Sequence, residues 1–574
     1  MKKYLHRLDP AFFQKESISI LLIIAIITYP ILFIWQCGDL TDSGFLATNY
    51  SFFFENLKQN NLNVLIFFSD FLGAIWNYFF SDLLGFIGFK LMYLIFLYFT
   101  LYLTYIIIKN LTSNRALLLF GILVGEIFAV RYDIFVFSYD IASWFFLILT
   151  SHFIFQGLNT NKFYFFYISG LCFFFAFLSR FSDVIFIFLL PIFFMIIYTF
   201  KIGKNSNLNL KLYFKNYLFF ILGIITMFSL LLIILYKSNF ITSNFLKPDN
   251  SHSISNILKS YIKETIDFIP YLIIVPSLLL SSSILYEYLK SKNKILFYVL
   301  FLVLLLYVSF IFLNDFSYIS NIKYFTPAFC VLPLLFSILH NNKYSVHILL
   351  IFFLSISQIA GTNTGVFLKF CYGLMILIPI TILVLSENYL ILINEIKINL
   401  RCGLYTGVFL ILFFSIYSRI GWIYHVDFGL GCRFRSTSLI ENNKMKGIFT
   451  IRKNAFFIKS ICNSIKHHTN KNETIFIYGH KPMLYYLTNK KPIINRYWLA
   501  NDVITADELF KLITKEIMKT NNYPAIIDTK EIILGGNGEE KLKDFLSENN
   551  YKKIVNSTSF NIWKKVDQNI IINH

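Results

Sequence analysis

The sequence predicts a polytopic α-helical membrane protein, with about thirteen transmembrane helices and a C-terminal extracytoplasmic α/β domain. Three observations predict this class. Hydrophobic residues make up 56% of the 574 residues, charged residues only 14%, and the mean hydropathy is +0.62. Soluble domains carry roughly 25% charged residues, so an ordinary soluble enzyme is excluded. Apolar runs of spanning length recur until about residue 420, where the composition becomes polar.

The N-terminal segment predicts a first helix that is retained. Lys2, Lys3 and Arg7 precede an apolar stretch from Ile18 to Trp35, and no small-residue cleavage site follows it. The predicted membrane-spanning segments are 17–36, 84–108, 115–130, 139–156, 163–179, 181–200, 215–236, 266–289, 295–313, 325–341, 345–360, 367–386 and 402–420.

The distribution of cations predicts the orientation in the membrane. Lys and Arg gather in alternate loops, for example at 201–215 and 290–294. Because cytoplasmic loops are enriched in these residues, the pattern predicts a cytoplasmic N-terminus in the cytoplasmic (inner) membrane. An odd number of helices then places everything after residue 420 outside. The same rule accounts for the net charge of +19, so we expect a lipid bilayer as partner and no nucleic acid.

The composition divides the chain into a transmembrane domain at 1–420 and a soluble α/β domain at 421–574. The long outer segment 37–83 is predicted as a loop with amphipathic material at 64–80. In the soluble part, short β-type runs alternate with helical patterns, which is typical of α/β domains. The predicted strands are 474–478, 492–494, 525–528 and 560–564, and the predicted helices are 455–467, 506–520 and 539–549.

Carboxylates are nearly absent from the predicted helices and gather at their outer ends. Asp42 follows the first helix, with Asp39 three residues earlier, and Asp140 lies at the mouth of the fourth. Arg180 and Lys323 end helices on the same side. An acid can take a proton from a hydroxyl and a cation can neutralise a phosphate, so a shared cavity would suit a lipid-borne phosphorylated substrate. The alternative is that the acids are solvated loop residues and the cations snorkel to the interface. The same alternative applies to Arg131, a further cation on this side.

Four segments resemble motifs of the GT-C superfamily of membrane glycosyltransferases. They are Asp42-Ser-Gly-Phe, Phe137-Ser-Tyr-Asp-Ile-Ala, Gly170-Leu-Cys-Phe-Phe-Phe-Ala-Phe-Leu-Ser-Arg and Lys323-Tyr324-Phe-Thr-Pro. The likeness covers about residues 17–420. It is nearest to the bacterial branch related to protein O-mannosyltransferases and the lipid A aminoarabinose transferase. The sequence departs from the pattern at Ser43, where a second acid is usual, and by exchanging the usual Lys and Arg at positions 180 and 323.

This resemblance implies an inverting transfer of a sugar from a polyprenyl-phosphate donor to a hydroxyl on a lipid, glycan or protein, at the outer face of the membrane. Asp42 would be the general base, with Asp39 as the second candidate. Asp140 would orient the acceptor or help to hold a divalent ion, which the resemblance leaves open as a cofactor. The other implied substrate-binding residues are Arg180, Lys323, Tyr324 and Arg131.

Two alternatives come from other classes of protein. A surface-polysaccharide polymerase or ligase is also polytopic with outer basic residues, but usually carries its large outer segment between helices. A non-enzymatic transporter of lipid-linked sugars would need polar or broken helices near the midplane, and long runs such as 218–235 offer few. In the soluble part, Gly479 and His480 lie in a strand–turn–helix pattern and could form a ligand-facing turn.

Overall fold

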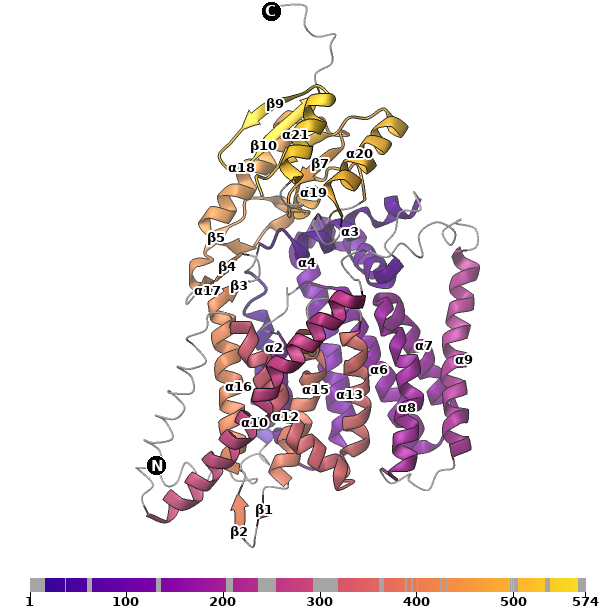
Figure 1. Cartoon of the computed structure of the whole chain (residues 1–574), viewed down its shortest axis with the longest axis vertical. Coiled ribbons are helices and arrows are strands. Elements are labelled where there is room, and N and C mark those ends of the chain that lie inside the picture. The colour runs from indigo at the N-terminus through magenta and orange to yellow at the C-terminus, as the bar shows by residue number, and fades with distance from the viewer. Residues whose placement is uncertain are drawn as a thin grey trace, which may run out of the picture.

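The computed structural model describes residues 16–36, 38–58, 64–130, 136–202, 210–235, 254–292, 318–360, 366–387, 390–393, 396–399, 401–423, 426–428, 432–495, 497, 499, 504–531 and 537–565. These residues form a long helical bundle with a small sheet at one end (Figure 1). A two-stranded hairpin, β1 (Leu390–Ile393) and β2 (Ile396–Asn399), lies at the opposite end of the bundle.

The helices of the bundle follow one another along the chain up to residue 421. They are α2 (Glu16–Ile31), α3 (Asp42–Lys58), α4 (Phe67–Lys109), α5 (Arg115–Val130), α6 (Tyr139–Thr160), α7 (Phe163–Ser179), α8 (Ile185–Thr199), α9 (Leu210–Leu235), α10 (Ile254–Lys292), α12 (Tyr318–Leu339), α13 (Ser345–Ile359), α14 (Val366–Lys369), α15 (Cys371–Glu387) and α16 (Arg401–Gly421). Short 3-10 helices precede α4 and α8, at Val64–Ile66 and Phe181–Val184.

The described helices confirm a helical membrane protein. Six are long and apolar enough to cross a membrane, namely Phe67–Lys109, Tyr139–Thr160, Phe181–Thr199, Leu210–Ile233, Ile257–Leu285 and Gly403–Gly421. Five shorter apolar helices accompany them, at Glu16–Ile31, Phe163–Ser179, Lys323–Leu339, Ser345–Ile359 and Cys371–Glu387. The predicted segment 295–313 lies outside the described residues, and every other predicted segment overlaps a helix. The number of spans stays a prediction.

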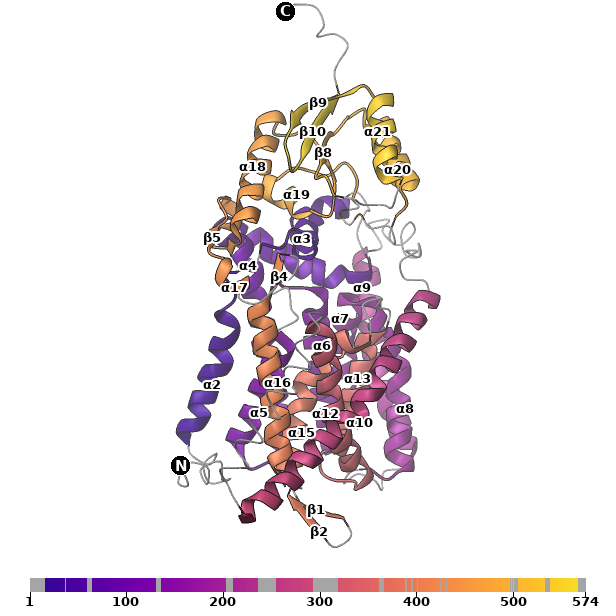
Figure 2. The same cartoon turned by 60° about the vertical axis from the view of Figure 1, so that its left-hand side comes forward.

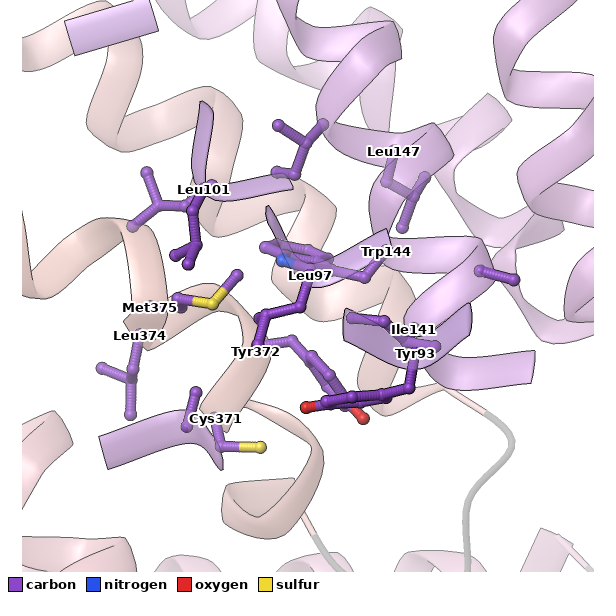
Figure 3. Close-up of a cluster of buried hydrophobic side chains, with 14 of the residues drawn as sticks. Tyr93, Leu97, Leu101, Ile141, Trp144, Leu147, Cys371, Tyr372, Leu374 and Met375 are labelled. Atoms are coloured by element: carbon purple, nitrogen blue, oxygen red, sulfur yellow. The ribbon is translucent and has the colours of Figure 1, made fainter. Parts of the chain in front are cut away.

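The helices differ in how far the protein itself covers them. In the most apolar 18-residue stretch of α6, 67% is buried inside the protein, whereas in the corresponding stretches of α9 and α10 only 17% is buried. Most of the apolar surface of α9 and α10 is therefore not covered by the protein, as expected for helices that face lipid. These two helices lie at the periphery of the bundle. Figure 3 shows the interior, where the packed side chains include Leu97 and Leu101 of α4, Trp144 and Leu147 of α6, and Leu374 and Met375 of α15.

The outer segment predicted as a loop is instead a helical hairpin. Residues 42–58 form α3, and α4 begins at Phe67, well before its apolar part. Helix α4 changes direction at Gly85, whose backbone is not helical (φ 52°, ψ −137°). A Cβ at this position would lie 2.5 Å from the carbonyl oxygen of Lys444. Gly85 therefore allows the kink and the close approach of a later segment, which apolar periodicity does not reveal.

Gly85→Ala is expected to lower the free energy of unfolding by about 1–2 kcal/mol or more, because an L side chain disfavours positive φ and the new methyl group meets backbone. Gly88→Ala is the matched control, since its Cβ would meet only side-chain atoms, the nearest at 3.2 Å. Thermal unfolding of the purified protein in detergent measures both. Equal losses in the two variants would contradict the role given to Gly85.

The cation-rich loops meet at the end of the bundle that carries the hairpin. Asn341, between α12 and α13, donates to the carbonyl oxygen of Lys201 after α8 at 2.9 Å. Lys343 pairs with Glu387 at the end of α15 at 3.0 Å. The Tyr344 hydroxyl donates to the same carboxylate at 2.9 Å. Loops predicted to share the cytoplasmic side therefore lie side by side, away from the sheet.

The C-terminal part of the chain forms a four-stranded mixed sheet in the order β7-β8-β10-β9. Strands β7 (Ile475–Tyr478) and β8 (Ala525–Asp528) are parallel, and β10 (Asn561–Lys565) is antiparallel to both β8 and β9 (Tyr551–Asn556). Three of the predicted strands coincide with β7, β8 and β10. The predicted strand at 492–494 is wrong, because Pro492, which has no N–H to donate, makes only an isolated bridge with Ile475.

Four helices cover this sheet, α18 (Arg452–His468), α19 (Met483–Thr488), α20 (Ala506–Thr520) and α21 (Gly538–Glu548). Helix α20 begins with a capping box between Thr505 and Glu508 and buries Leu509, Ile513 and Ile517 on one face. Shorter elements connect α16 to α18: β3 (Trp422–Ile423), β4 (Asp427–Phe428), α17 (Cys432–Arg435), β5 (Ser438–Leu439), a 3-10 turn at Asn443–Met445 and β6 (Phe449–Thr450).

Candidate functional site

Two cations and two acids meet where α6 begins and where α7 and α14 end. Arg180 lies between α7 and the 3-10 turn before α8, and its Nε is 3.6 Å from Asp140 Oδ1. The other oxygen of Asp140 pairs with the ammonium group of Lys369 on α14. Arg180 Nη1 is also 4.0 Å from Asp183 Oδ1. The side chains of Asp140 and Lys369 are 12% and 15% exposed, so the cluster is largely enclosed and its charges balance internally.

A hydrogen-bond network from α6 and α13 holds this ion cluster. Gln358 accepts from Arg180 Nη1 through its side-chain oxygen at 3.2 Å and also through its backbone oxygen. Its amide nitrogen donates to Ser143 Oγ at 2.8 Å and to Asp183 Oδ1 at 3.2 Å. The Ser143 hydroxyl donates to Asp183 as well. Arg180 therefore has several protein acceptors, which makes it a group that positions Asp140.

Helix α14 links this cluster to Lys323. Lys323 Nζ is 2.6 Å from Glu264 Oε1 on α10, and both side chains are largely buried, at 15% and 11% exposed. The second oxygen of Glu264 accepts from the backbone N–H of Phe367 on α14 at 3.2 Å. The ring of Tyr324 packs on Phe367, with centroids 5.1 Å apart. Since Lys369 lies two residues later, α14 carries one contact to each ion pair.

Asp42 and Asp39 have different environments at the start of α3. Asp39 is fully buried, and its carboxylate accepts from the backbone N–H groups of Thr41 at 2.9 Å and Ser43 at 2.7 Å. It therefore stabilises the N-terminal end of the helix, where backbone donors lack partners. Asp42 is only partly buried, and it lies near enough to Tyr139, the residue before Asp140, for a weak electrostatic interaction. Of the two, Asp42 is the one that remains accessible.

The N-terminal end of α3 lies against the C-terminal part of the chain. Met483 at the start of α19 donates its N–H to the carbonyl oxygen of Leu40 at 3.1 Å. Thr48 donates its hydroxyl to the carbonyl oxygen of Pro482 at 2.8 Å. A Cβ on Gly44 would lie 2.4 Å from the backbone nitrogen of Met483. Figure 1 shows α19 beside α3, so these contacts hold the C-terminal sheet next to α3.

Gly44→Ala is expected to separate these surfaces, because the methyl group would meet the backbone of Met483. Limited proteolysis should then release the C-terminal part faster than from the wild type, by roughly tenfold or more for a loss of about 1.4 kcal/mol. Ser51→Ala is the control, since the Ser51 hydroxyl only donates to Ala47 of its own helix. Unchanged cleavage of Gly44→Ala would mean that the contact with α19 does not hold the two parts together.

The Gly479–His480 turn is closed by protein groups. Gly479 has a φ of +151°, and a Cβ there would meet the Thr529 hydroxyl. Glu531 accepts from the backbone N–H of His480 at 2.8 Å and pairs with Lys481. Burial alone would raise the pKa of Glu531, but the Lys481 charge and these hydrogen bonds lower it below its usual range. The carboxylate of Glu531 therefore occupies the place beside the His480 N–H and Lys481 where a bound anion would lie.

The predicted site residues are brought together in part. Asp140 and Arg180 form an ion pair. Lys323 and Tyr324 are linked to this pair through contacts with α14. Asp42 lies near enough to Tyr139 for a weak electrostatic interaction. Arg131 lies outside the described residues. Among the residues that the structure describes, no group of three His, Cys, Asp or Glu side chains could hold a metal ion. Both oxygens of Asp140 face cations, so this carboxylate does not fit the metal-holding role that the resemblance left open.

Sequence reasoning missed Lys369, Glu264 and Gln358 as members of the site. Lys369 carried a usable signal, because a cation inside an apolar run is costly at membrane depth and needs a partner. Glu264 and Gln358 carried no such signal. Glu264 contacts Lys323, which is 59 positions away in the chain. Gln358 contacts Arg180, which is 178 positions away.

No protein-family model matches the chain, and no curated protein matches it either.

Proposed function

We propose that the protein transfers a sugar from a polyprenyl-phosphate carrier to a hydroxyl-bearing acceptor at the outer face of the cytoplasmic membrane. The observation that supports this most is the linked set of charges at one end of the bundle, in which α14 joins the Asp140 cluster to Lys323 and Asp42 lies nearby. Such a site offers a carboxylate for a hydroxyl proton and cations for a phosphate.

In the proposed reaction the acceptor oxygen attacks the anomeric carbon from the face opposite the carrier. Its proton moves to the carboxylate of Asp42, and the bond from the anomeric carbon to the phosphate oxygen breaks with its electron pair on the leaving lipid phosphate. Lys323 and Lys369, each 15% exposed, stabilise that charge. Arg180 holds Asp140, which orients the acceptor, and its charge also supports the leaving phosphate.

The proposed sidedness has the N-terminus in the cytoplasm and the C-terminal part outside. It is supported by the meeting of the cation-rich loops at the end away from the sheet. A reporter fused after Lys565 should be active only outside, and one fused after Lys201 only inside. A cytoplasmic signal from the Lys565 fusion would put the acids and the carrier phosphate on the wrong side for this function.

The proposed function is tested with the purified protein in liposomes and a radiolabelled polyprenyl-phosphate sugar. Transfer of one sugar to an acceptor, with release of the lipid phosphate, is the expected result. Products of many lengths would indicate a polymerase. Movement of the intact donor across the bilayer without bond cleavage would indicate a transporter and would exclude the proposed reaction.

A further inference from the structure

A basic segment connects α16 to the sheet. Residues 432–459 contain seven Lys and Arg residues and one acid, Glu441. The other cation-rich loops meet at the opposite end of the bundle, where the positive-inside rule accounts for them. That rule gives no reason for a basic segment at the end that carries the sheet. An excess of one charge at a surface favours a partner of the opposite charge, so an anionic partner is indicated.

This segment lies where α2 and α16 leave the bundle. Helix α16 is of spanning length over Gly403–Gly421, and Figure 2 shows α17 above the upper ends of α2 and α16. The backbone N–H of Phe449 on β6 donates to the carbonyl oxygen of Trp35 at 2.7 Å. Asn454, in the first turn of α18, donates to the carbonyl oxygen of Gly38 at 3.2 Å. Because a helix of this length only just crosses the hydrocarbon core, we expect the segment to lie at the boundary of the membrane.

Large apolar side chains of the segment are exposed at this boundary. Phe434 on α17 and Phe456 on α18 are 74% and 72% exposed. Leu439 and Phe449 lie opposite each other across the β5–β6 hairpin, and they are 49% and 37% exposed. A single exposed apolar side chain is ordinary, but here four occur in one short segment. Leu32, directly after α2, is 66% exposed, so the segment extends the apolar outer side of α2.

Cations accompany these apolar side chains. Arg452 and Lys453 begin α18 and are exposed. Arg452 and Phe456 are four residues apart, so they lie on one face of the helix. Cations in the first turn face the positive end of the helix dipole, which is unfavourable for the helix by itself. Negative charge close by, as on anionic lipid headgroups, would offset this cost.

We propose that residues 432–459 rest on the membrane leaflet at the sheet end of the bundle, and that their partner is a lipid surface with anionic headgroups. Phe434 and Phe456 enter the boundary between headgroups and acyl chains, and Arg452 and Lys453 contact the anionic headgroups. The contact holds the C-terminal part of the chain close to the membrane beside α2. It goes beyond the proposed function, because none of these residues takes part in sugar transfer.

The first test locates Phe434 in the full-length protein, in nanodiscs whose lipids carry brominated acyl chains. Bromine quenches tryptophan emission at close range. The emission that Phe434→Trp adds to that of the wild type should therefore fall by roughly half or more, because the ring enters the interface. Met518→Trp is the matched control, because Met518 is 79% exposed on α20, which Figures 1 and 2 show on the side away from α2. Its added emission should stay unchanged. Emission of Phe434→Trp that is shifted to the blue but not quenched would mean that protein, such as a second copy of the chain, covers this position, and it would overturn the proposal.

The second test measures amide hydrogen exchange of residues 432–459 in phosphatidylcholine nanodiscs with and without phosphatidylglycerol. In the wild type the anionic lipid should slow this exchange by roughly tenfold or more, since two basic side chains gain attraction to the surface. Arg452→Gln/Lys453→Gln should lose most of this protection at unchanged thermal stability. Lys511→Gln/Lys515→Gln, which removes two exposed cations from α20, should keep it. Equal exchange in the two lipids overturns the proposal, as does equal protection in the two double variants. Neither test involves sugar transfer, so the proposed function can fail while this contact stands.

Discussion

Asp42→Asn is expected to lower the rate of sugar transfer by about 10²–10⁴-fold while the protein stays folded and binds its lipid-linked donor. Asn keeps the size of Asp and most of its hydrogen bonds, but it cannot accept the proton of the attacking hydroxyl. Donor binding depends on the cations and on the apolar helices, which the substitution leaves in place. The measurements are initial transfer rates from the purified lipid-linked sugar and donor binding in the same preparation.

Asp39→Asn is the matched comparison, because it changes the same type of side chain in the same segment. The Asp39 carboxylate is fully buried and accepts from the N–H groups of Thr41 and Ser43. Its loss should therefore reduce stability by about 1 kcal/mol and reduce transfer less than Asp42→Asn. Near-normal transfer by Asp42→Asn together with loss in Asp39→Asn would move the base to Asp39. Near-normal transfer by both would remove this segment from the chemistry.

Lys369→Met should have the largest effect on stability, a loss of about 3–5 kcal/mol, because it leaves the buried Asp140 without its closest cation. Asp140→Asn should likewise leave Lys369 without its acid. In the double variant Lys369→Met/Asp140→Asn neither charge remains, so it should be more stable than the sum of the single losses predicts. Transfer should stay low in all three, since the acceptor and the leaving phosphate both lose a partner.

Thermal unfolding in detergent and the transfer rate measure this cycle. Arg180 keeps Asp183 and Gln358 as partners in every variant, which limits collapse of the network. Additive stability losses would mean that Lys369 and Asp140 do not interact as the geometry indicates. Recovery of transfer in the double variant would mean that the pair is structural and has no part in the reaction.

The length and apolarity of the runs predicted most of the bundle, because a helix must satisfy its own backbone inside lipid. The hairpin of α3 and α4 was not predictable in the same way. Its first helix mixes aromatic residues with polar residues such as Asn49 and Glu55. This pattern predicts neither a membrane-spanning helix nor a simple amphipathic helix. The kink at Gly85 and the docking of Gly44 on Met483 depend on segments hundreds of residues away, about which local patterns carry no information.

The candidate site was predictable only where charge is unusual in its local setting. Asp140 and Arg180 stood out because each interrupts an apolar region at a helix end, and the structure pairs them at 3.6 Å. Their partners were less visible. Glu264 lies in a polar stretch of α10 among other charged residues, and Gln358 is an ordinary amide in an apolar helix. The register of α10 and α13 against α14 determines their contacts, and that register follows from packing in three dimensions.

The most direct measurement is the amount of polyprenyl phosphate released for each sugar transferred by the purified protein in liposomes, with Asp42→Asn as the control. Sugar transfer requires that the bond between the anomeric carbon and the phosphate oxygen breaks once per product. The expected result is equal amounts of released lipid phosphate and glycosylated acceptor in the wild type, and neither in Asp42→Asn. Donor that remains intact with the wild type, under conditions in which it is bound, would contradict the proposed reaction.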